Sequence, residues 1–167
     1  MTLPAPIARV PWPIWAALAS AAMLATAHAF QHFGYQPCNL CLRQREAYWG
    51  ALVVAGAGLA LVWLKRLPLW AVSLMLGGVF AAGAMVAAFH AGVEWKWFPV
   101  PQACASIGGA AVEVSDLMAI LDGAKLKPPG CEEAAWRMLG LSMAGWNALV
   151  SAGLAAIGFL AARGGRA

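Results

Sequence analysis

The chain has 167 residues, of which 62% are hydrophobic and only 11% are charged. A soluble domain is about half apolar and about a quarter charged, so this chain has too few charged side chains to cover a core in water. The net charge of +4 does not indicate a nucleic-acid partner, because the Lys and Arg residues are scattered in ones and twos. The composition therefore predicts a membrane protein.

Four segments are long and apolar enough to be membrane-spanning helices, which need about 17 to 25 residues. They cover residues 14–33, 47–64, 69–91 and 141–162, and none contains Lys, Arg, Asp or Glu. Their many Gly, Ala and Ser residues allow close helix packing in lipid. We therefore expect an all-α membrane protein, in which residues 1–167 form one integral domain built as a four-helix bundle.

The first segment also has features of a cleavable signal peptide, because Arg9 precedes the apolar run and the sequences Ala-Thr-Ala at 25–27 and Ala-His-Ala at 27–29 are similar to a cleavage site. Small residues are common in any alanine-rich membrane helix, so they do not by themselves indicate cleavage. An uncleaved first helix gives an even helix count and a consistent charge pattern. We therefore expect the segment to be retained.

Charge placement predicts the orientation of the bundle. The short segments at one side are basic and contain no acidic residue; they hold Arg9, Lys65, Arg66, Arg163 and Arg166. The positive-inside rule places these segments, and both termini, in the cytoplasm of a bacterial cell. Residues 34–46 and 92–140 then form two periplasmic loops of an inner-membrane protein. Apolar residues at helical spacing within 112–122 predict a short amphipathic helix in the second loop.

All four cysteines of the chain fall in or beside the two predicted outer loops: Cys38, Cys41, Cys104 and Cys131. An oxidising outer compartment favours two disulfides, and four cysteines allow three pairings. Local geometry favours Cys38 with Cys41, and Cys104 with Cys131. Disulfides that only brace the loops remain an alternative.

The first pair forms a CxxC motif directly before the second predicted helix. A helix N-terminus stabilises negative charge, and thiolate is the reactive form of cysteine in disulfide exchange. If the helix begins near Cys38, Arg45 lies one turn beyond Cys41 on the same face. This spacing places a cation beside the thiols, although an interfacial arginine that extends toward the headgroups has the same spacing.

Metal and haem sites are disfavoured by the spacing. Haem attachment needs CxxCH, and Leu42 follows Cys41. A four-cysteine zinc site usually has two CxxC knuckles, whereas Cys104 and Cys131 are single. We therefore expect no metal. His90 can be explained without a functional role, as a hydrogen-bonded histidine at the membrane interface.

The sequence resembles the DsbB family of disulfide bond formation proteins. The resemblance is carried by Pro-Cys-Asn-Leu-Cys at 37–41, Arg45, His90 at the end of the third helix, the lone Cys104 and Cys131, and Trp-Arg-Met-Leu-Gly-Leu-Ser-Met at 136–143. It implies a quinone-dependent thiol-disulfide oxidoreductase that reoxidises a periplasmic, thioredoxin-fold carrier of the DsbA type. The quinone is ubiquinone or menaquinone.

The resemblance also implies roles for the individual residues. The carrier attacks Cys104, Cys131 is its partner in the loop, and electrons then pass to Cys38 and Cys41. Cys41 faces the quinone as a thiolate, with a charge-transfer contact or an adduct to the ring. Arg45 helps to hold the quinone and stabilise negative charge, and His90 lies near the same pocket.

Two features depart from the family pattern: the CxxC interior is Asn-Leu, and Gln44 occupies a position that is often acidic. They leave the choice of partner and the redox tuning open. Chemistry like that of vitamin K epoxide reductases is disfavoured, since that family has its loop cysteines before the CxxC. The competing hypothesis from another class is a structural four-helix membrane protein with loop-bracing disulfides.

Overall fold

The computed structural model describes residues 11–35, 37–102, 104, 130–134 and 136–165. Within these residues the elements in chain order are α2 (Trp12–His32), α3 (Asn39–Trp63), α4 (Leu69–Glu94), β1 (Arg137–Met138), β2 (Leu141–Ser142) and α7 (Met143–Gly164). The two short strands pair antiparallel, with Arg137 opposite Ser142. The predicted helix at 112–122 lies outside the described residues.

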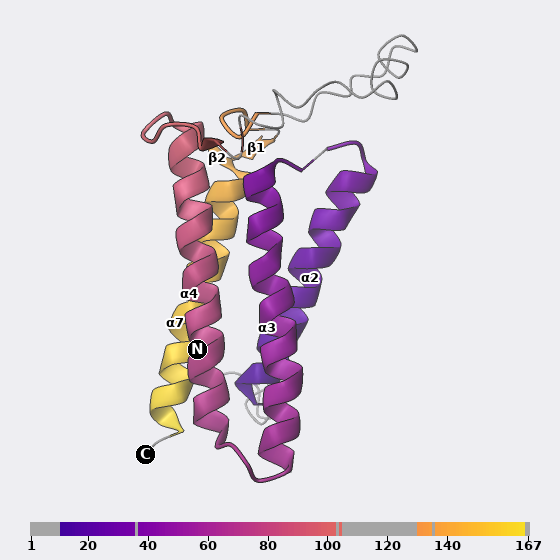
Figure 1. Ribbon diagram of the computed structural model, residues 1–167, viewed down its shortest axis with the longest axis vertical. Coiled ribbons are helices and arrows are strands. Elements are labelled where there is room, and N and C mark those ends of the chain that lie inside the picture. The colour runs from indigo at the N-terminus through magenta and orange to yellow at the C-terminus, as the bar shows by residue number, and fades with distance from the viewer. Residues whose placement is uncertain (1–10, 36, 103, 105–129, 135, 166–167) are drawn as a thin grey trace.

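Neighbouring helices run in alternating directions, so the α3–α4 turn and the end of α7 lie at one end of the bundle (Figure 1). The strands and the start of α3 lie at the opposite end. Helix α4 is central and packs against α7 and α3, while α2 packs chiefly on α3. The buried side chains between the helices include Ala51, Val72, Leu76 and Phe80. All four helices are long and apolar enough to cross a membrane, which confirms the predicted all-α membrane bundle.

The second helix begins at Asn39, eight residues before the predicted start at residue 47. Because most of the residues at 43–46 are charged, the apolar pattern does not extend over the first turns of this helix. Arg43 and Glu46 form an ion pair of 3.1 Å on the exposed face, where charge is tolerated beside an apolar helix. The first outer loop is thus shorter than predicted, and the CxxC motif lies in the first turn of α3.

The other helix ends also differ from the predicted ones. Helix α4 continues to Glu94 rather than ending at residue 91, so Glu94 lies one turn after His90 on the same helix. Helix α7 begins at Met143, because the Ser142 side chain accepts a hydrogen bond from the Gly145 N–H and caps the helix. Residues 141 and 142, predicted as helix, form β2.

Glycines allow α4 and α7 to approach closely, as in many membrane bundles. A Cβ atom placed on Gly158 of α7 would lie 2.9 Å from the Cα atom of Gly77 in α4. That neighbour is backbone and has no rotamer by which to move away. A Cβ atom on Gly153, also in α7, would have nothing within 4 Å.

The first prediction concerns this contact. We expect Gly158→Ala to destabilise the bundle by about 1–3 kcal/mol, because the added methyl group forces α4 and α7 apart. The thermal unfolding midpoint of the detergent-solubilised protein measures the effect. The matched control is Gly153→Ala, which should leave the midpoint unchanged or slightly raised. Equal midpoints for the two variants would contradict close packing at Gly158.

Candidate functional site

The CxxC motif forms the N-terminal cap of α3. The Sγ atom of Cys38 accepts a hydrogen bond from the backbone N–H of Cys41 at 3.2 Å, as an N-cap side chain does. The two sulfur atoms lie 2.7 Å apart and are not covalently bonded. The predicted Cys38–Cys41 disulfide is therefore not formed in this structure, in which the two sulfur atoms are in contact without a covalent bond.

The second pair is a disulfide between Cys104 and Cys131, with Cα atoms 5.9 Å apart. Cys38, Cys104 and Cys131 form one buried cluster, against which Leu40 and Cys41 pack. The two cysteine pairs are therefore neighbours, although they come from opposite halves of the chain. Cys104 is the more accessible member of the disulfide, at 8% exposed against 2% for Cys131.

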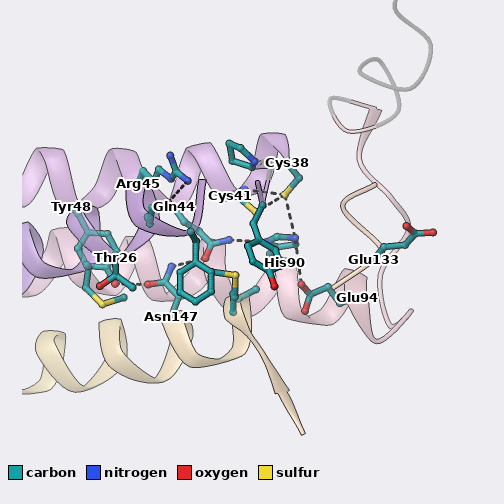
Figure 2. A pocket seen from close by; sticks show the side chains of 17 residues that line it. Thr26, Cys38, Cys41, Gln44, Arg45, Tyr48, His90, Glu94, Glu133 and Asn147 are labelled. Carbon is teal, nitrogen blue, oxygen red and sulfur yellow. Dashed lines mark hydrogen bonds and ion pairs between the residues drawn. The ribbon is translucent and has the colours of Figure 1, made fainter. Parts of the chain in front are cut away.

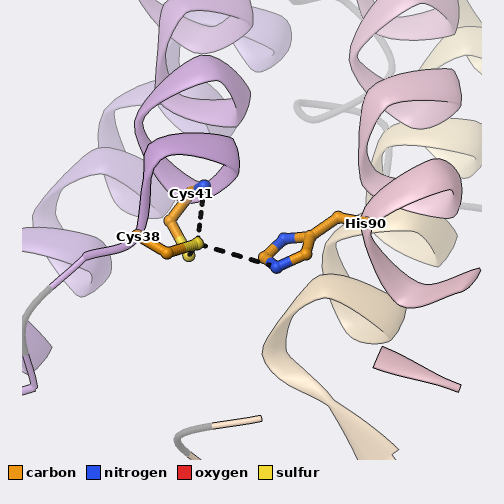
Figure 3. Close-up of side chains that lie close together, drawn as sticks. All are labelled: Cys38, Cys41 and His90. Atoms are coloured by element: carbon orange, nitrogen blue, oxygen red, sulfur yellow. Dashed lines mark hydrogen bonds between the residues drawn. The ribbon is translucent and has the colours of Figure 1, made fainter. Parts of the chain in front are cut away.

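His90 of α4 faces the thiol pair (Figure 3). Its Nε2 atom lies 3.6 Å from the Sγ atom of Cys38, and its Nδ1 atom lies 2.7 Å from the Nε2 atom of Gln44. The Gln44 amide nitrogen also donates to the backbone carbonyl of Leu40 at 3.3 Å, so this end of the amide is the donor. Nδ1 of His90 is then an acceptor, and the neutral ring carries its proton on Nε2, toward Cys38.

A chain of polar side chains holds Gln44 in this orientation. Asn147 of α7 donates from Nδ2 to the Gln44 Oε1 atom at 2.5 Å, and the Tyr48 hydroxyl donates to Asn147 Oδ1. Ser151 lies 2.9 Å from the same hydroxyl group. These hydrogen bonds link α3, α4 and α7, and buried polar groups are favourable only when they are paired in this way.

The surroundings of Cys38 stabilise its thiolate form. The hydrogen bond from the Cys41 thiol lowers the pKa of the Cys38 thiol to about 4, against the opposing effect of burial. Hydrogen bonds from His90 and from the backbone N–H of Cys41 lower the pKa further. Thiolate is the form in which a cysteine acts as a nucleophile.

The thiol pair opens on a cavity of about 150 Å³ between α2, α3, α4 and α7 (Figure 2). Much of the lining is apolar and comes from α2 and α7: Met23, Ala27, Phe30, Met143 and Ala144. Polar groups come mainly from α3 and α4, including Cys41, Arg45, His90 and Glu94. The result is an apolar pocket in which a few polar groups converge, as is typical of small-molecule sites.

Arg45 lines the same cavity as Cys41, as their helical spacing predicted. Its guanidinium group donates to the Gln31 Oε1 atom at 2.8 Å and to the Ala27 carbonyl at 3.1 Å, both on α2. These bonds hold the cation at the cavity wall. Two of its five N–H donors are used in this way, which leaves donors for a ligand.

The ligand atoms of Cys38, Cys41 and His90 lie within 4.8 Å of one another, which is also a possible metal site. Two thiolates bound to one tetrahedral zinc ion, each at about 2.3 Å, lie about 3.7 Å apart. The observed separation of the sulfur atoms is only 2.7 Å. The sulfur atoms are thus closer together than two zinc ligands would be, and the absence of a metal in the native protein stays a prediction.

Sequence reasoning missed the polar neighbours of the thiol pair. Gln44 stood out only as a departure from a family pattern, and Tyr48, Glu94 and Asn147 were not singled out at all. Glu94 could have been found as an acidic residue one turn after His90, at the end of an otherwise uncharged helix. The contact between Asn147 and Gln44 joins distant parts of the chain, and no local signal predicts it.

The fold and the site define a multi-pass membrane protein with a thiol pair at the mouth of an apolar cavity. The family model described as "Disulfide bond formation protein DsbB" matches residues 9–161. The chain therefore belongs to the DsbB family, as its cysteine pattern predicted.

Curated relatives named "Disulfide bond formation protein B" support the same assignment. The protein of Polaromonas sp. is 31% identical over 144 residues, covering 86% of this chain and 84% of the relative. That of Marinobacter nauticus is 32% identical over 138 residues, covering 79% of each. That of Albidiferax ferrireducens is 32% identical over 134 residues, covering 80% and 75%. No solved structure matches the chain.

The second prediction concerns the charge on Cys38. In a Cys104→Ser/Cys131→Ser background, the reduced protein should keep its thiolate absorbance as the pH falls from 8 and lose it only near the lowered pKa of about 4. An ordinary cysteine loses it near pH 8.5. His90→Ala should move the transition to higher pH, because it removes a hydrogen bond to the thiolate. A wild-type transition near pH 8.5 would contradict the assignment.

Proposed function

We propose that this protein is a quinone-dependent thiol-disulfide oxidoreductase, which reoxidises a periplasmic dithiol carrier of the DsbA type and passes two electrons to a membrane quinone. The observation that carries the proposal is the single buried cluster of both cysteine pairs, one of which opens on the apolar cavity. Electrons can move between the pairs by thiol-disulfide exchange, which needs direct contact of sulfur atoms.

The Cys104–Cys131 disulfide is the entry point for electrons. A carrier thiolate attacks Cys104, the more accessible sulfur, and Cys131 leaves as a thiolate. Cys131 then attacks Cys38 of an oxidised Cys38–Cys41 pair, and Cys41 leaves. The carrier's second cysteine attacks the mixed disulfide, which oxidises the carrier and frees Cys104 as a thiolate. Cys104 then attacks Cys131, which restores the Cys104–Cys131 disulfide and leaves both electrons on Cys38 and Cys41. Cys131 and Cys38 belong to the same buried cluster, which suits this transfer.

The same order of exchange reactions accounts for the role of Cys41. In the thiol pair Cys41 donates to the charged Cys38, whereas the family resemblance assigns the thiolate to Cys41. When Cys38 is bonded to Cys131, it no longer carries the charge. Cys41 is then the released sulfur and lines the cavity as a thiolate. The two assignments thus belong to two stages of one cycle.

The cavity has the properties that a quinone headgroup requires. The apolar walls from α2 and α7 suit a flat ring, and the N–H donors of Arg45 can bind a ring oxygen. When bound, ubiquinone or menaquinone supplies an acceptor for two electrons and two protons. His90 lies beside Cys38 at the same cavity, where it stabilises the sulfur charge.

This function requires a defined orientation in the membrane. We place the protein in the bacterial inner membrane, with the cysteine-bearing end in the periplasm and both termini in the cytoplasm, in agreement with the basic segments at the other end of the bundle. The alternative, a structural membrane protein with bracing disulfides, gives no reason for an unbonded Cys38–Cys41 pair at a cavity.

The third prediction tests the activity. Purified protein in detergent should oxidise a reduced DsbA-type carrier and reduce ubiquinone or menaquinone, which absorbance changes of the quinone follow. Cys41→Ser should abolish turnover, and Arg45→Ala should raise the KM for quinone about tenfold, the effect of losing one charged hydrogen bond. Arg43→Ala is the matched control, because Arg43 is exposed and pairs only with Glu46 among the described residues.

The outcomes separate the two hypotheses. Turnover that depends on Cys41 supports the oxidoreductase. Folded protein that reduces neither quinone with several carriers would instead support the structural membrane protein.

The fourth prediction concerns the entry point. A carrier with only its attacking cysteine should form a mixed disulfide with the protein, visible by non-reducing electrophoresis, and mass spectrometry should map it to Cys104. Cys104→Ser should abolish this adduct. An adduct that maps to Cys38 would reverse the proposed order of the two pairs.

A further inference from the structure

Oxidation of the thiol pair must release a proton inside a buried site. The dithiol and a quinone give a disulfide and a hydroquinone, with two electrons and two protons transferred. Cys38 has already lost its proton in the thiol pair, and the Cys41 thiol, which donates to it, still holds one. Forming the S–S bond therefore requires a proton acceptor for Cys41.

His90 is poorly suited to be that acceptor. Its Nδ1 atom already accepts from the Gln44 amide, and its Nε2 atom carries the ring proton toward Cys38. A second ring proton on Nδ1 would face the N–H group of the Gln44 side chain. The Gln44 amide cannot easily rotate to accept that proton, because it is hydrogen-bonded to Asn147 and to the Leu40 carbonyl. His90 is thus fixed as a hydrogen-bond donor to the sulfur atom.

Among the other titratable groups around the cavity, only one is suited to accept the proton of Cys41. Arg45 from α3 is a permanent cation, and the Tyr48 hydroxyl from the same helix is bound to Asn147 and Ser151. Tyr35, which also lines the cavity, is an exposed side chain. Two carboxyl groups remain: Glu133, which is exposed, and Glu94, which is 8% exposed. Only Glu94 is enclosed with the thiol pair.

Glu94 has no evident structural task at its position. It is the last residue of α4, and a helix C-terminus favours cations rather than anions. Its Oε1 atom lies 3.8 Å from the Nε2 atom of His90, as Figure 2 shows. Its Oε2 atom is buried and has no hydrogen-bond partner among the residues that the structure describes. A buried acceptor without a partner is costly, so such groups call for an explanation.

We propose that Glu94 accepts the proton of the Cys41 thiol during oxidation of the Cys38–Cys41 pair, directly or through one water in the cavity. This inference rests on the proposed function and deepens it. The S–S bond forms as two electrons pass to the quinone, and the proton moves from Cys41 to the free oxygen of Glu94. From there the proton passes to the reduced quinone, which restores Glu94 in each cycle. The quinone takes its second proton from solvent, in place of the one that Cys38 had already released.

The test is a half-reaction with pre-reduced, full-length protein and ubiquinone. Glu94→Gln keeps the shape of the side chain but cannot accept the proton, so the rate of quinone reduction should fall about 100-fold, the lower range for general acid–base catalysis. The KM for quinone and the rate of mixed-disulfide formation with the carrier should not change. Raising the pH should recover the rate, because hydroxide then takes the proton.

Two further variants separate proton transfer from a packing role. Glu94→Asp keeps a carboxyl group and should retain most of the rate. Glu46→Gln is the matched control, because it removes an exposed carboxyl group at the same end of the bundle, with 62% of its side chain exposed. A Glu94→Gln rate within twofold of wild type overturns the proposal, as does an equal loss in Glu94→Asp with a raised KM. If the wild type reduces no quinone, the proposed function itself fails.

Discussion

The hydrogen bond between Gln44 and His90 is the interaction on which the site depends. It joins α3 to α4 in an apolar interior, where an unpaired polar group would be costly. It also fixes the ring proton of His90 on Nε2, so the ring presents an N–H donor to Cys38. Because Asn147 and Tyr48 determine the orientation of Gln44, the protonation pattern beside the sulfur atoms is set partly by α7.

The helix packing makes this arrangement possible. Small residues let α4 and α7 approach closely, so that Asn147 reaches a side chain on α3 beside the central helix. The early start of α3 gives the cysteine pair a helix N-terminus and its free N–H groups. A start at residue 47 would have left the motif in a loop, without the N–H group that binds Cys38.

The sequence predicts the fold well, because a membrane-spanning helix must be apolar over its whole length. The four helices, Arg45 on the same helix face as Cys41 and the four cysteines at one end of the bundle follow from composition and spacing. The polar chain from Tyr48 to His90 could not be predicted, since it depends on which faces of three helices meet. Helix ends were misplaced where charged residues, such as Arg43 and Glu46, project outward from a helix that continues past them. The state of the Cys38–Cys41 pair could not be predicted either, because both states fit one sequence.

The position of α2 has a consequence for how the proposed quinone would reach the cavity. This helix packs chiefly on α3 and has few contacts with α4 and α7, yet it supplies one wall of the cavity. The wall that separates the reactive sulfur from the bilayer is therefore the least firmly attached part of the bundle. Exchange past α2 would occur within the plane of the membrane. Supply would then depend on the mole fraction of quinone among the lipids and on lateral diffusion, and not on any concentration in water.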